Sequence, residues 1–375
     1  MRAIIAAAGT GGHINPGIAI ANKMKEKEPD SEIIFIGTNR GLEHDLVSRA
    51  GYKLETIEAY GLQRKLSIEN IKQMISTIKS VSEAKKIIKE FKPDVIVGTG
   101  GYICGPVFFG KNINGIPKVI HESNAYPGKA VKMLEKKVDK IFVGFEETRG
   151  KLLKAKEVIV TGTPTKLKKI TLEEDKRKEI LKEFNIKNDL PIVLVFGGSQ
   201  GAQRINETIQ KLLEEKLNEK YQIIWATGIK QFDIIKEKYE KANILMNNIQ
   251  NVKIVPYIYN MEELMNIADL LVCRSGAMTV TEIAMVGKAS ILIPLPTSSA
   301  NRQEDNARVL ESLGAGKIIL DKELNSSILS KKIDEIVHDK HKLRGMGKAA
   351  NKIAKYNVED RIYDEIKKLI LTNKE

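Results

Sequence analysis

Short apolar runs alternate with amphipathic helical patterns along the first half of the chain. Each run leads into a turn, and the turn leads into a stretch whose apolar positions recur at helical spacing. This alternation is typical of a parallel, doubly wound sheet with helices on both faces. The pattern predicts strands at residues 3–8, 32–36, 95–97, 118–121 and 140–143.

The same alternation starts again in the second half, with an apolar run bounded by Pro191 and Gly197. We therefore expect two similar α/β domains, an N-terminal one over residues 1–163 and a C-terminal one over 164–354. The last helical pattern, about 355–375, carries its apolar residues on one face, and we expect it to pack back on the first domain. The predicted strands of the second half are 191–196, 222–226, 252–255, 270–273, 289–293 and 316–320.

Glycine-rich turns follow several of these strands. Gly9-Thr10-Gly11-Gly12-His13 comes after the first strand, and Gly98-Thr99-Gly100-Gly101-Tyr102 repeats it after the strand at 95–97. Glycine lets backbone N–H groups approach an anion closely, although a tight turn with a surface histidine would look the same. Both turns would lie at the carboxyl edge of one sheet, where open α/β sheets bind ligands.

Two further turns lie in the second half. Gly197-Gly198-Ser199-Gln200-Gly201 precedes a helix, where Ser199 would either cap that helix or contact a phosphate. Ser275-Gly276-Ala277 opens another helix, which carries Glu282. A carboxylate there could accept two hydrogen bonds from a ribose, although a solvated helix glutamate is the plainer reading.

Composition limits the class of protein. The chain is 42% hydrophobic and 29% charged, which is usual for a globular protein. Met1 leads directly into the first strand, so we expect no signal peptide, and no window resembles a membrane span.

Cys104 and Cys273 lack a CxxC partner, so we expect reduced thiols and no metal site. The net charge of +13 indicates an anionic partner, but we find no nucleic-acid-binding signature.

Several motifs are missing from the sequence. It contains no GxGxxG after the first strand, no GxxxxGK[ST] and no Asp-x-Asp pair. These absences weigh against an NAD enzyme, a P-loop kinase and a metal-held nucleotide diphosphate. If the protein binds a diphosphate, helix N-termini, backbone N–H groups and basic side chains would have to offset its negative charge.

Seven motifs, in order along nearly the whole chain, resemble the MurG family, the peptidoglycan N-acetylglucosaminyltransferases that act on lipid I. They are GTGGHINPG at 9–17, GTGGYICGP at 98–106, HESNA at 121–125, GGSQGAQRIN at 197–206, YIYNM at 257–261, CRSGAMTVTE at 273–282 and RQEDNA at 302–307.

The resemblance implies a GT-B fold, with two Rossmann-like domains facing each other across a cleft. It implies metal-independent, inverting transfer of N-acetylglucosamine from its UDP donor to the 4-hydroxyl of the muramoyl sugar of lipid I. The implied transfer reaction needs no cofactor. The resemblance makes His13 the candidate base or electrostatic helper. The implied donor-binding residues are Thr10, Gly11, Gly12, Asn124, Lys166, Ser199, Ile258, Ala277, Met278, Thr279, Glu282 and Gln303, and Gly101, Tyr102 and Asn124 lie on the acceptor side.

Two positions depart from the family pattern. Lys166 ends a Gly-Thr-Pro-Thr-Lys segment where the family often has Gly-Asn-Pro-x-Arg, and Ser123 stands where a glutamine is usual. Lysine keeps the positive charge but loses the bidentate geometry of arginine.

Lipid I is membrane-bound, so we expect a peripheral enzyme on the cytoplasmic face of the membrane. The basic stretch 64–92, with Phe108, Phe109 and Lys111, is the candidate contact with anionic lipid. An ordinary helix with isoleucines inward and lysines outward would also fit this stretch.

Three other functions remain compatible with parts of the sequence. The first is another GT-B enzyme that uses a UDP-sugar, either a glycolipid glycosyltransferase or an epimerase. The second is a basic nucleic-acid-binding protein, which would leave the four glycine-rich turns unexplained. The third is a non-catalytic nucleotide-sugar sensor, which would have no need of a base such as His13.

Overall fold

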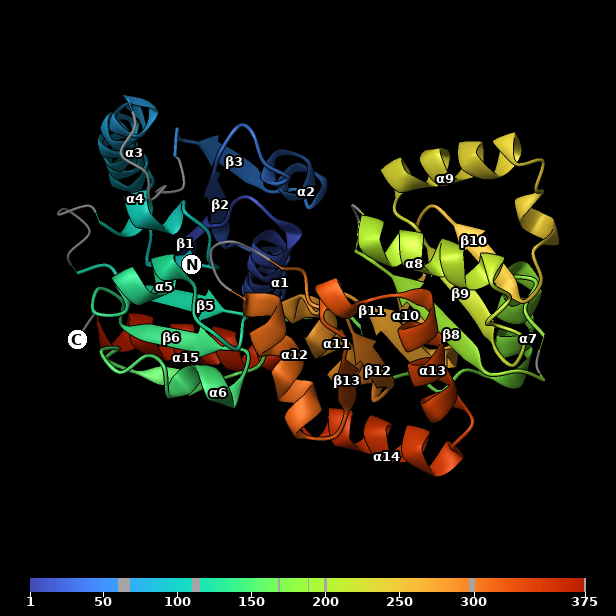
Figure 1. Ribbon diagram of the computed structural model, residues 1–375. Helices are drawn as coiled ribbons and strands as arrows, with labels where there is room; N and C mark the ends of the chain where they lie inside the picture. The colour runs from blue at the N-terminus through green and yellow to red at the C-terminus, as the bar shows by residue number, and fades with distance from the viewer. Residues whose placement is uncertain are drawn as a thin grey trace. The chain divides into compact units, whose positions relative to one another are not determined.

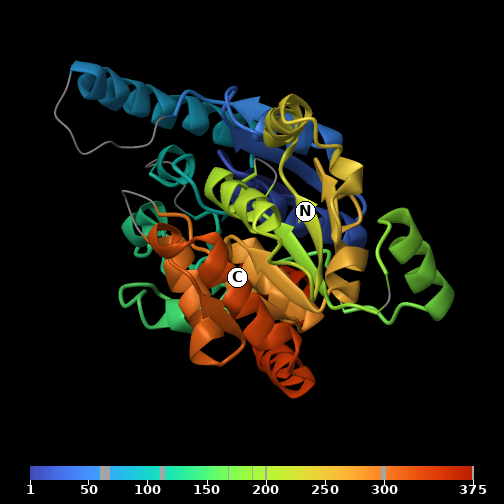
Figure 2. The ribbon, with the colours of Figure 1, turned by 45° about the vertical axis from the view of Figure 1, so that its right-hand side comes forward.

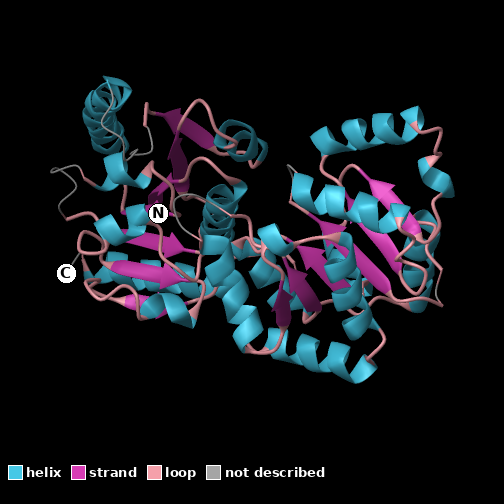
Figure 3. Ribbon diagram, in the orientation of Figure 1, coloured by secondary structure: helices cyan, strands magenta, loops and turns pink. Residues whose placement is uncertain are grey.

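The computed structural model describes residues 1–59, 68–109, 115–167, 169–187, 189–198, 201–296 and 301–373, and for residues 68–78 and 247 it describes the backbone alone. The chain divides into two compact units. Unit 1 comprises Met1–Thr165 and Lys355–Glu375, and unit 2 comprises Lys166–Ala354. Each unit is a sheet with helices on both faces (Figure 3).

Unit 1 contains a seven-stranded sheet, parallel throughout, in the order β3-β2-β1-β4-β5-β6-β7. Its strands are β1 (Arg2–Ala6), β2 (Glu32–Gly37), β3 (Lys53–Thr56), β4 (Val95–Gly98), β5 (Lys118–Glu122), β6 (Lys140–Val143) and β7 (Val158–Val160). Its helices are α1 (Gly11–Lys27), α2 (Glu43–Arg49), α3 (Ile68–Phe91), α4 (Cys104–Phe108), α5 (Lys129–Leu134), α6 (Glu146–Arg149) and α15 (Val358–Thr372) (Figure 1). The longest of these helices is α3, the blue helix at the top of Figure 2.

Both faces of this sheet are buried, because successive side chains of a strand point to opposite sides. In β1, Ile4 and Ala6 belong to one core cluster, whereas Ala3 and Ile5 belong to the other. Helices α3, α4 and α5 cover the first face, and α1 and α15 cover the second. A strand buried on both faces reads as a continuous apolar run, as the sequence of β1 does.

Helix α15 brings the C-terminal end of the chain back to unit 1. Its buried face, with Ile362 and Ile366, packs in the same core cluster as Ile14 and Met24 of α1. At the rim, the Glu28 carboxylate accepts hydrogen bonds from the Met1 amino terminus, the Tyr363 hydroxyl and the Lys367 ammonium. The bond from Lys367 is the main cause that lowers the pKa of Glu28 to about 2.

Unit 2 contains a six-stranded parallel sheet in the order β10-β9-β8-β11-β12-β13. Its strands are β8 (Ile192–Phe196), β9 (Gln222–Ala226), β10 (Val252–Val255), β11 (Leu270–Cys273), β12 (Ala289–Leu292) and β13 (Gly316–Ile318). Its helices are α7 (Glu174–Glu183), α8 (Gln203–Glu214), α9 (Ile229–Lys241), α10 (Met261–Ile267), α11 (Ala277–Val286), α12 (Arg302–Ser312), α13 (Ser326–Val337) and α14 (Lys340–Asn351), with short 3-10 turns at Met246–Asn248 and Asp321–Glu323.

In both sheets the chain order reverses beside the first strand. It reverses between β1 and β4 in unit 1, and between β8 and β11 in unit 2. Open α/β sheets bind ligands at such a switch point, outside the carboxyl ends of the strands. All four glycine-rich turns follow these four strands, so the topology places them at the two switch points. The expected α/β class with two Rossmann-like sheets is confirmed.

The strand predictions missed two edges of the first sheet. β3 carries polar residues and pairs only with β2, and β7 is a three-residue strand that pairs only with β6. β3 is a partly exposed edge strand in which polar and apolar residues alternate, so it lacks the apolar run on which the prediction depended. β7 is apolar throughout and was overlooked.

Over the described ranges, none of the helices is both long and apolar enough to cross a membrane. Cys104 and Cys273 are free and buried, and burial raises the pKa of the Cys104 thiol to about 12.

Candidate active site

The two GTGG turns of unit 1 lie side by side, because β1 and β4 are neighbouring strands with Ala6 opposite Gly98. The first turn leads into α1 with Thr10 in an extended conformation at the N-cap position. His13 follows in the first turn of α1. The predicted residues Thr10, Gly11, Gly12 and His13 therefore share one sheet edge with Gly101 and Tyr102.

The second turn supports the His13 ring. Nδ1 of His13 lies 3.0 Å from the backbone oxygen of Thr99. A carbonyl only accepts hydrogen bonds, so the neutral ring carries its proton on Nδ1, and Nε2 then holds the lone pair that a base needs.

The glycines of the second turn are required by space as well as by conformation. A Cβ added at Gly100 would lie 2.6 Å from Nδ1 of His13, and one at Gly101 would lie 2.8 Å from the Ala8 oxygen. Both residues also have positive φ, at 99° and 84°. The repeated motif therefore has a physical basis, because the second copy makes room for the histidine of the first.

The end of β5 adds Asn124 to the same edge. The buried Glu122 carboxylate accepts hydrogen bonds from the Asn124 backbone and side-chain amides, at 2.9 and 2.8 Å, and from the Gly128 N–H at 2.6 Å. His121 is also buried, its Nε2 lies 3.0 Å from the Gly162 oxygen, and burial lowers the pKa of its ring. Glu122 was assigned no role from sequence, although it belongs to the HESNA motif together with Asn124.

In unit 2, the turns after β8, β11 and β12 surround a cavity of about 560 Å³. It joins the glycine-rich turn to the first residues of α8, to Arg274 after β11 and to Gln303 of α12. Ser199 lies outside the described residues, and the N-cap position of α8 is Ala202. The cavity is lined by Gly197, Gly198, Gly201, Ala202, Gln203, Arg204, Glu207, Arg274, Leu295 and Gln303.

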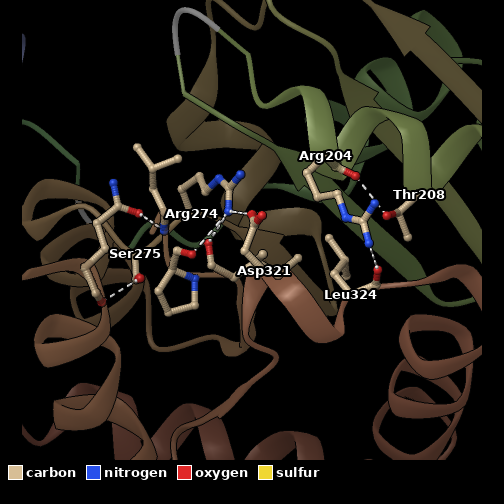
Figure 4. Close-up of polar contacts among 10 residues, drawn as sticks. Arg204, Thr208, Arg274, Ser275, Asp321 and Leu324 are labelled. Atoms are coloured by element: carbon tan, nitrogen blue, oxygen red, sulfur yellow. Dashed lines mark hydrogen bonds and ion pairs between the residues drawn. The ribbon is translucent and has the colours of Figure 1, made fainter. Parts of the chain in front are cut away.

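Two arginines, Arg204 and Arg274, line this cavity. Figure 4 shows their polar contacts. The Arg274 guanidinium is nearly buried, donates to the Ile293 and Pro294 oxygens at 3.1 and 3.3 Å, and forms an ion pair with Asp321. Arg204 donates to the Leu324 oxygen at 2.9 Å. Neither arginine was assigned a role from sequence, although both belong to the motifs quoted above. The Arg204 guanidinium has no carboxylate partner among the described residues, so it suits an anionic ligand, whereas Asp321 offsets the charge of Arg274.

Gln303 is oriented by its neighbours. Its side-chain oxygen accepts from the Leu295 N–H at 2.9 Å, and its backbone oxygen accepts from the Ser275 hydroxyl at 2.7 Å. The side-chain NH₂ group donates to no residue that the structure describes. It is therefore a donor suited to a ligand hydroxyl.

Other predicted donor residues lie in unit 2 but do not line this cavity. Ala277, Met278 and Thr279 form the first turn of α11 and are half-buried, as is Glu282. Burial raises the pKa of the Glu282 carboxyl to about 7. The Ile258 side chain is buried, so only its backbone could face a ligand. Lys166 is exposed at the start of unit 2.

The proposed membrane segment is only partly described. Residues 64–67 and Lys111 lie outside the described ranges, and α3 accounts for residues 68–91. Lys79, Lys85, Lys86 and Lys89 are exposed. The inclusion of Phe108 was wrong, because this last residue of α4 is buried in the core, whereas Phe109 is 37% exposed.

Within the residues described, no three His, Cys, Asp or Glu side chains are grouped as metal ligands would be.

Comparison with known proteins agrees with this geometry. Residues 3–143 match the model of the glycosyltransferase family 28 N-terminal domain, and residues 192–362 match that of the C-terminal domain. The chain is 43% identical over 371 residues to a protein of Acetivibrio thermocellus. The alignment covers 99% of this chain and 98% of that protein. That relative is named UDP-N-acetylglucosamine--N-acetylmuramyl-(pentapeptide) pyrophosphoryl-undecaprenol N-acetylglucosamine transferase. A protein of Ruminiclostridium cellulolyticum with the same name is 41% identical, and the alignment covers 99% of this chain and 100% of that protein.

A solved structure indicates the same family as these relatives. The crystal structure of Acinetobacter baumannii MurG superposes with a TM-score of 0.78, at 27% identity, over 98% of this chain and 99% of that one. The chain belongs to the MurG family. The resemblance found from the seven motifs is thereby confirmed, and the protein is a glycosyltransferase. In a MurG-family protein, the two switch points described above are the candidate acceptor and donor sites.

Proposed function

We propose that this protein transfers N-acetylglucosamine from UDP-N-acetylglucosamine to the 4-hydroxyl of the muramoyl sugar of lipid I, and so forms lipid II for peptidoglycan synthesis. The identity of 43% across 99% of the chain to a transferase of that name is the observation that carries the proposal. The four glycine-rich turns at the two switch points support it.

The chemistry is a displacement with inversion at the sugar's anomeric carbon. The acceptor 4-hydroxyl oxygen forms a bond to that carbon while the bond to the UDP diphosphate breaks, and UDP leaves with the bonding electrons. His13 takes the hydroxyl proton on Nε2, which the hydrogen bond from Nδ1 to Thr99 favours. Asn124, Gly101 and Tyr102 lie on the same sheet edge, where we place the acceptor sugar.

The donor lies at the edge of unit 2. Arg204 and the N-termini of α8 and α11 would offset the charge that grows on the departing diphosphate. Gln303 would donate to a sugar hydroxyl, and the ionised Glu282 would accept from the ribose. The predicted contributions of Ser199, Lys166 and the Ile258 backbone remain part of this proposal.

We also propose that the transfer needs no metal ion, because these basic groups and backbone N–H donors supply the positive potential. The site of action would be the cytoplasmic surface of the membrane that holds lipid I.

The decisive experiment is label transfer from UDP-N-acetylglucosamine to a lipid I analogue, with and without EDTA. Formation of the disaccharide product is expected under both conditions. An absence of product, or conversion of the donor sugar alone, would favour another UDP-sugar enzyme such as an epimerase. Activity that EDTA abolishes and Mg²⁺ restores would contradict the metal-independent mechanism without changing the reaction.

A further inference from the structure

Glu43, the first residue of α2, turns its carboxylate inward against the first glycine-rich turn. Oε2 accepts a hydrogen bond from the Gly9 N–H at 3.0 Å. Oε1 accepts from the Thr38 N–H at 3.0 Å and also from the Thr38 hydroxyl. Glu43 and Thr38 are both fully buried. One carboxylate therefore joins the turn after β1 to the end of β2.

This carboxylate is ionised at neutral pH. Burial alone would raise its pKa, but the hydrogen bonds from Thr38 and Gly9 outweigh burial and hold the pKa of Glu43 below its ordinary value. Hydrogen bonds to an ionised acceptor are stronger than those between neutral groups. The link between Gly9 and Glu43 is consequently a stiff one.

The surrounding backbone leaves space for this side chain. A Cβ at Gly41 would lie 1.9 Å from Oε2 of Glu43, and a Cβ at Gly37 would lie 2.9 Å from its Cγ. Neither glycine has a positive φ, so space rather than backbone conformation explains them. Two glycines thus accommodate one inward-facing glutamate.

We propose that Glu43 is a positioning residue that holds the Gly9–His13 turn in its working geometry. The turn is anchored by the Glu43 carboxylate at Gly9 and by the Thr99 oxygen at the His13 ring. If the first anchor is removed, Gly9 is free to shift, and the start of α1 shifts with it. The consequence for turnover rests on the function proposed above, in which His13 takes a proton. The consequence for the turn itself does not depend on that function.

The test variant is Glu43→Gln, which keeps the side-chain shape. Its amide has only one oxygen, so its NH₂ group must face either the Gly9 N–H or the Thr38 N–H, donor against donor. The matched control is Asp94→Asn. Asp94 accepts from the Arg2 N–H at 2.8 Å, at the opposite end of the same strand, β1. Both variants remove a carboxylate from a backbone N–H of unit 1, but only the first does so beside the turn.

Three measurements are compared in the full-length protein: kcat and KM with UDP-N-acetylglucosamine and a lipid I analogue, UDP affinity, and hydrogen exchange of the amides of residues 9–13. Glu43→Gln should lower kcat about tenfold or more, because small misplacements of a reacting group are costly. It should leave UDP affinity within about twofold and accelerate exchange at residues 9–13. Asp94→Asn should lower Tm without changing kcat or that exchange.

Wild-type kcat and exchange in Glu43→Gln would overturn the proposal. An equal loss of kcat in Asp94→Asn would also overturn it, because Glu43 would then act only through stability. If the wild type itself transfers no sugar, the proposed function fails, and the exchange comparison alone decides whether Glu43 holds the turn.

Discussion

His13 is held at one ring nitrogen by the backbone oxygen of the second GTGG turn. His13→Ala should therefore lower kcat by roughly 10²–10⁴-fold, as expected for loss of a general base. UDP affinity should change little, because the residues expected to bind the UDP part of the donor, Ser199, Ile258 and Glu282, belong to unit 2. A rise in KM for lipid I with kcat unchanged would instead assign His13 to acceptor binding. The matched control is His44→Ala, an exposed histidine of α2 in the same unit, which should retain full activity.

Glu282 gives a pH dependence with a definite sign. Only its carboxylate form accepts two hydrogen bonds from a ribose, and burial raises its pKa to about 7. The affinity for UDP should therefore be highest above this pKa. It should fall as the pH drops through the pKa, by up to about tenfold between pH 8 and pH 6.

The measurement is calorimetry of UDP binding across this range for the wild type and Glu282→Gln. UDP titrates near the same pH, so the informative quantity is the difference between the two proteins. The variant should bind more weakly at pH 8 and should show a flatter profile. Parallel profiles for the two proteins would remove Glu282 from the ribose site.

Helix α15 comes last in the chain but stabilises unit 1, which the first residues form. Ile366 is fully buried in the core that α15 shares with α1, so Ile366→Ala should lower the free energy of unfolding of unit 1 by about 2–5 kcal/mol. Leu371 is 56% exposed on the same helix, and Leu371→Ala should cost less than about 0.5 kcal/mol.

The two units need separate probes, because a chain with two domains need not unfold in one step. The protein has a single tryptophan, Trp225, and it is buried in unit 2. Ile366→Ala should accelerate hydrogen exchange in β1 and α1 while the urea transition of Trp225 fluorescence stays in place. A shift of that fluorescence transition alone would contradict the assignment of α15 to unit 1.

The elements also explain which parts of the structure could be predicted from sequence. Central strands such as β1 and β8 are buried on both faces, so their apolar runs identify them, and the glycine turns after them fall at the switch points. The edge strand β3 alternates polar with apolar residues and lacks that signal. The Glu43–Gly9 contact spans 34 residues of sequence, and no local pattern indicates which carboxylate faces a turn. Phe108 was misplaced because an apolar residue near a basic stretch fits a membrane contact and a core equally well.

For the whole molecule, the net charge of +13 predicts binding to anionic surfaces. Lys79, Lys85, Lys86 and Lys89 are exposed on α3, and basic residues near an anionic leaflet contribute about 1 kcal/mol each. Neutralising all four to Gln should weaken binding to vesicles containing anionic lipid by about tenfold or more, and salt should weaken the wild type in the same way.

The control for this prediction neutralises four exposed lysines of α9 in unit 2, Lys230, Lys236, Lys238 and Lys241. It changes the net charge equally and should bind vesicles better than the α3 variant. Equal losses in both variants would mean that overall charge, and not α3, determines the attraction. Activity on a short-chain soluble acceptor should survive in both.

The return of the last residues to unit 1 also sets an order of events on the ribosome. Unit 1 lacks α15 until all of unit 2 has been translated, which takes roughly 10–40 s at the usual pace of synthesis. During that interval the sheet face that carries Ala3, Ile5 and Phe35 has α1 but not α15 as its cover. Unit 2 is contiguous in sequence and is able to fold first. The nascent chain therefore carries an unfinished apolar surface for most of its synthesis, and we expect it to need a holding chaperone until its final helix emerges.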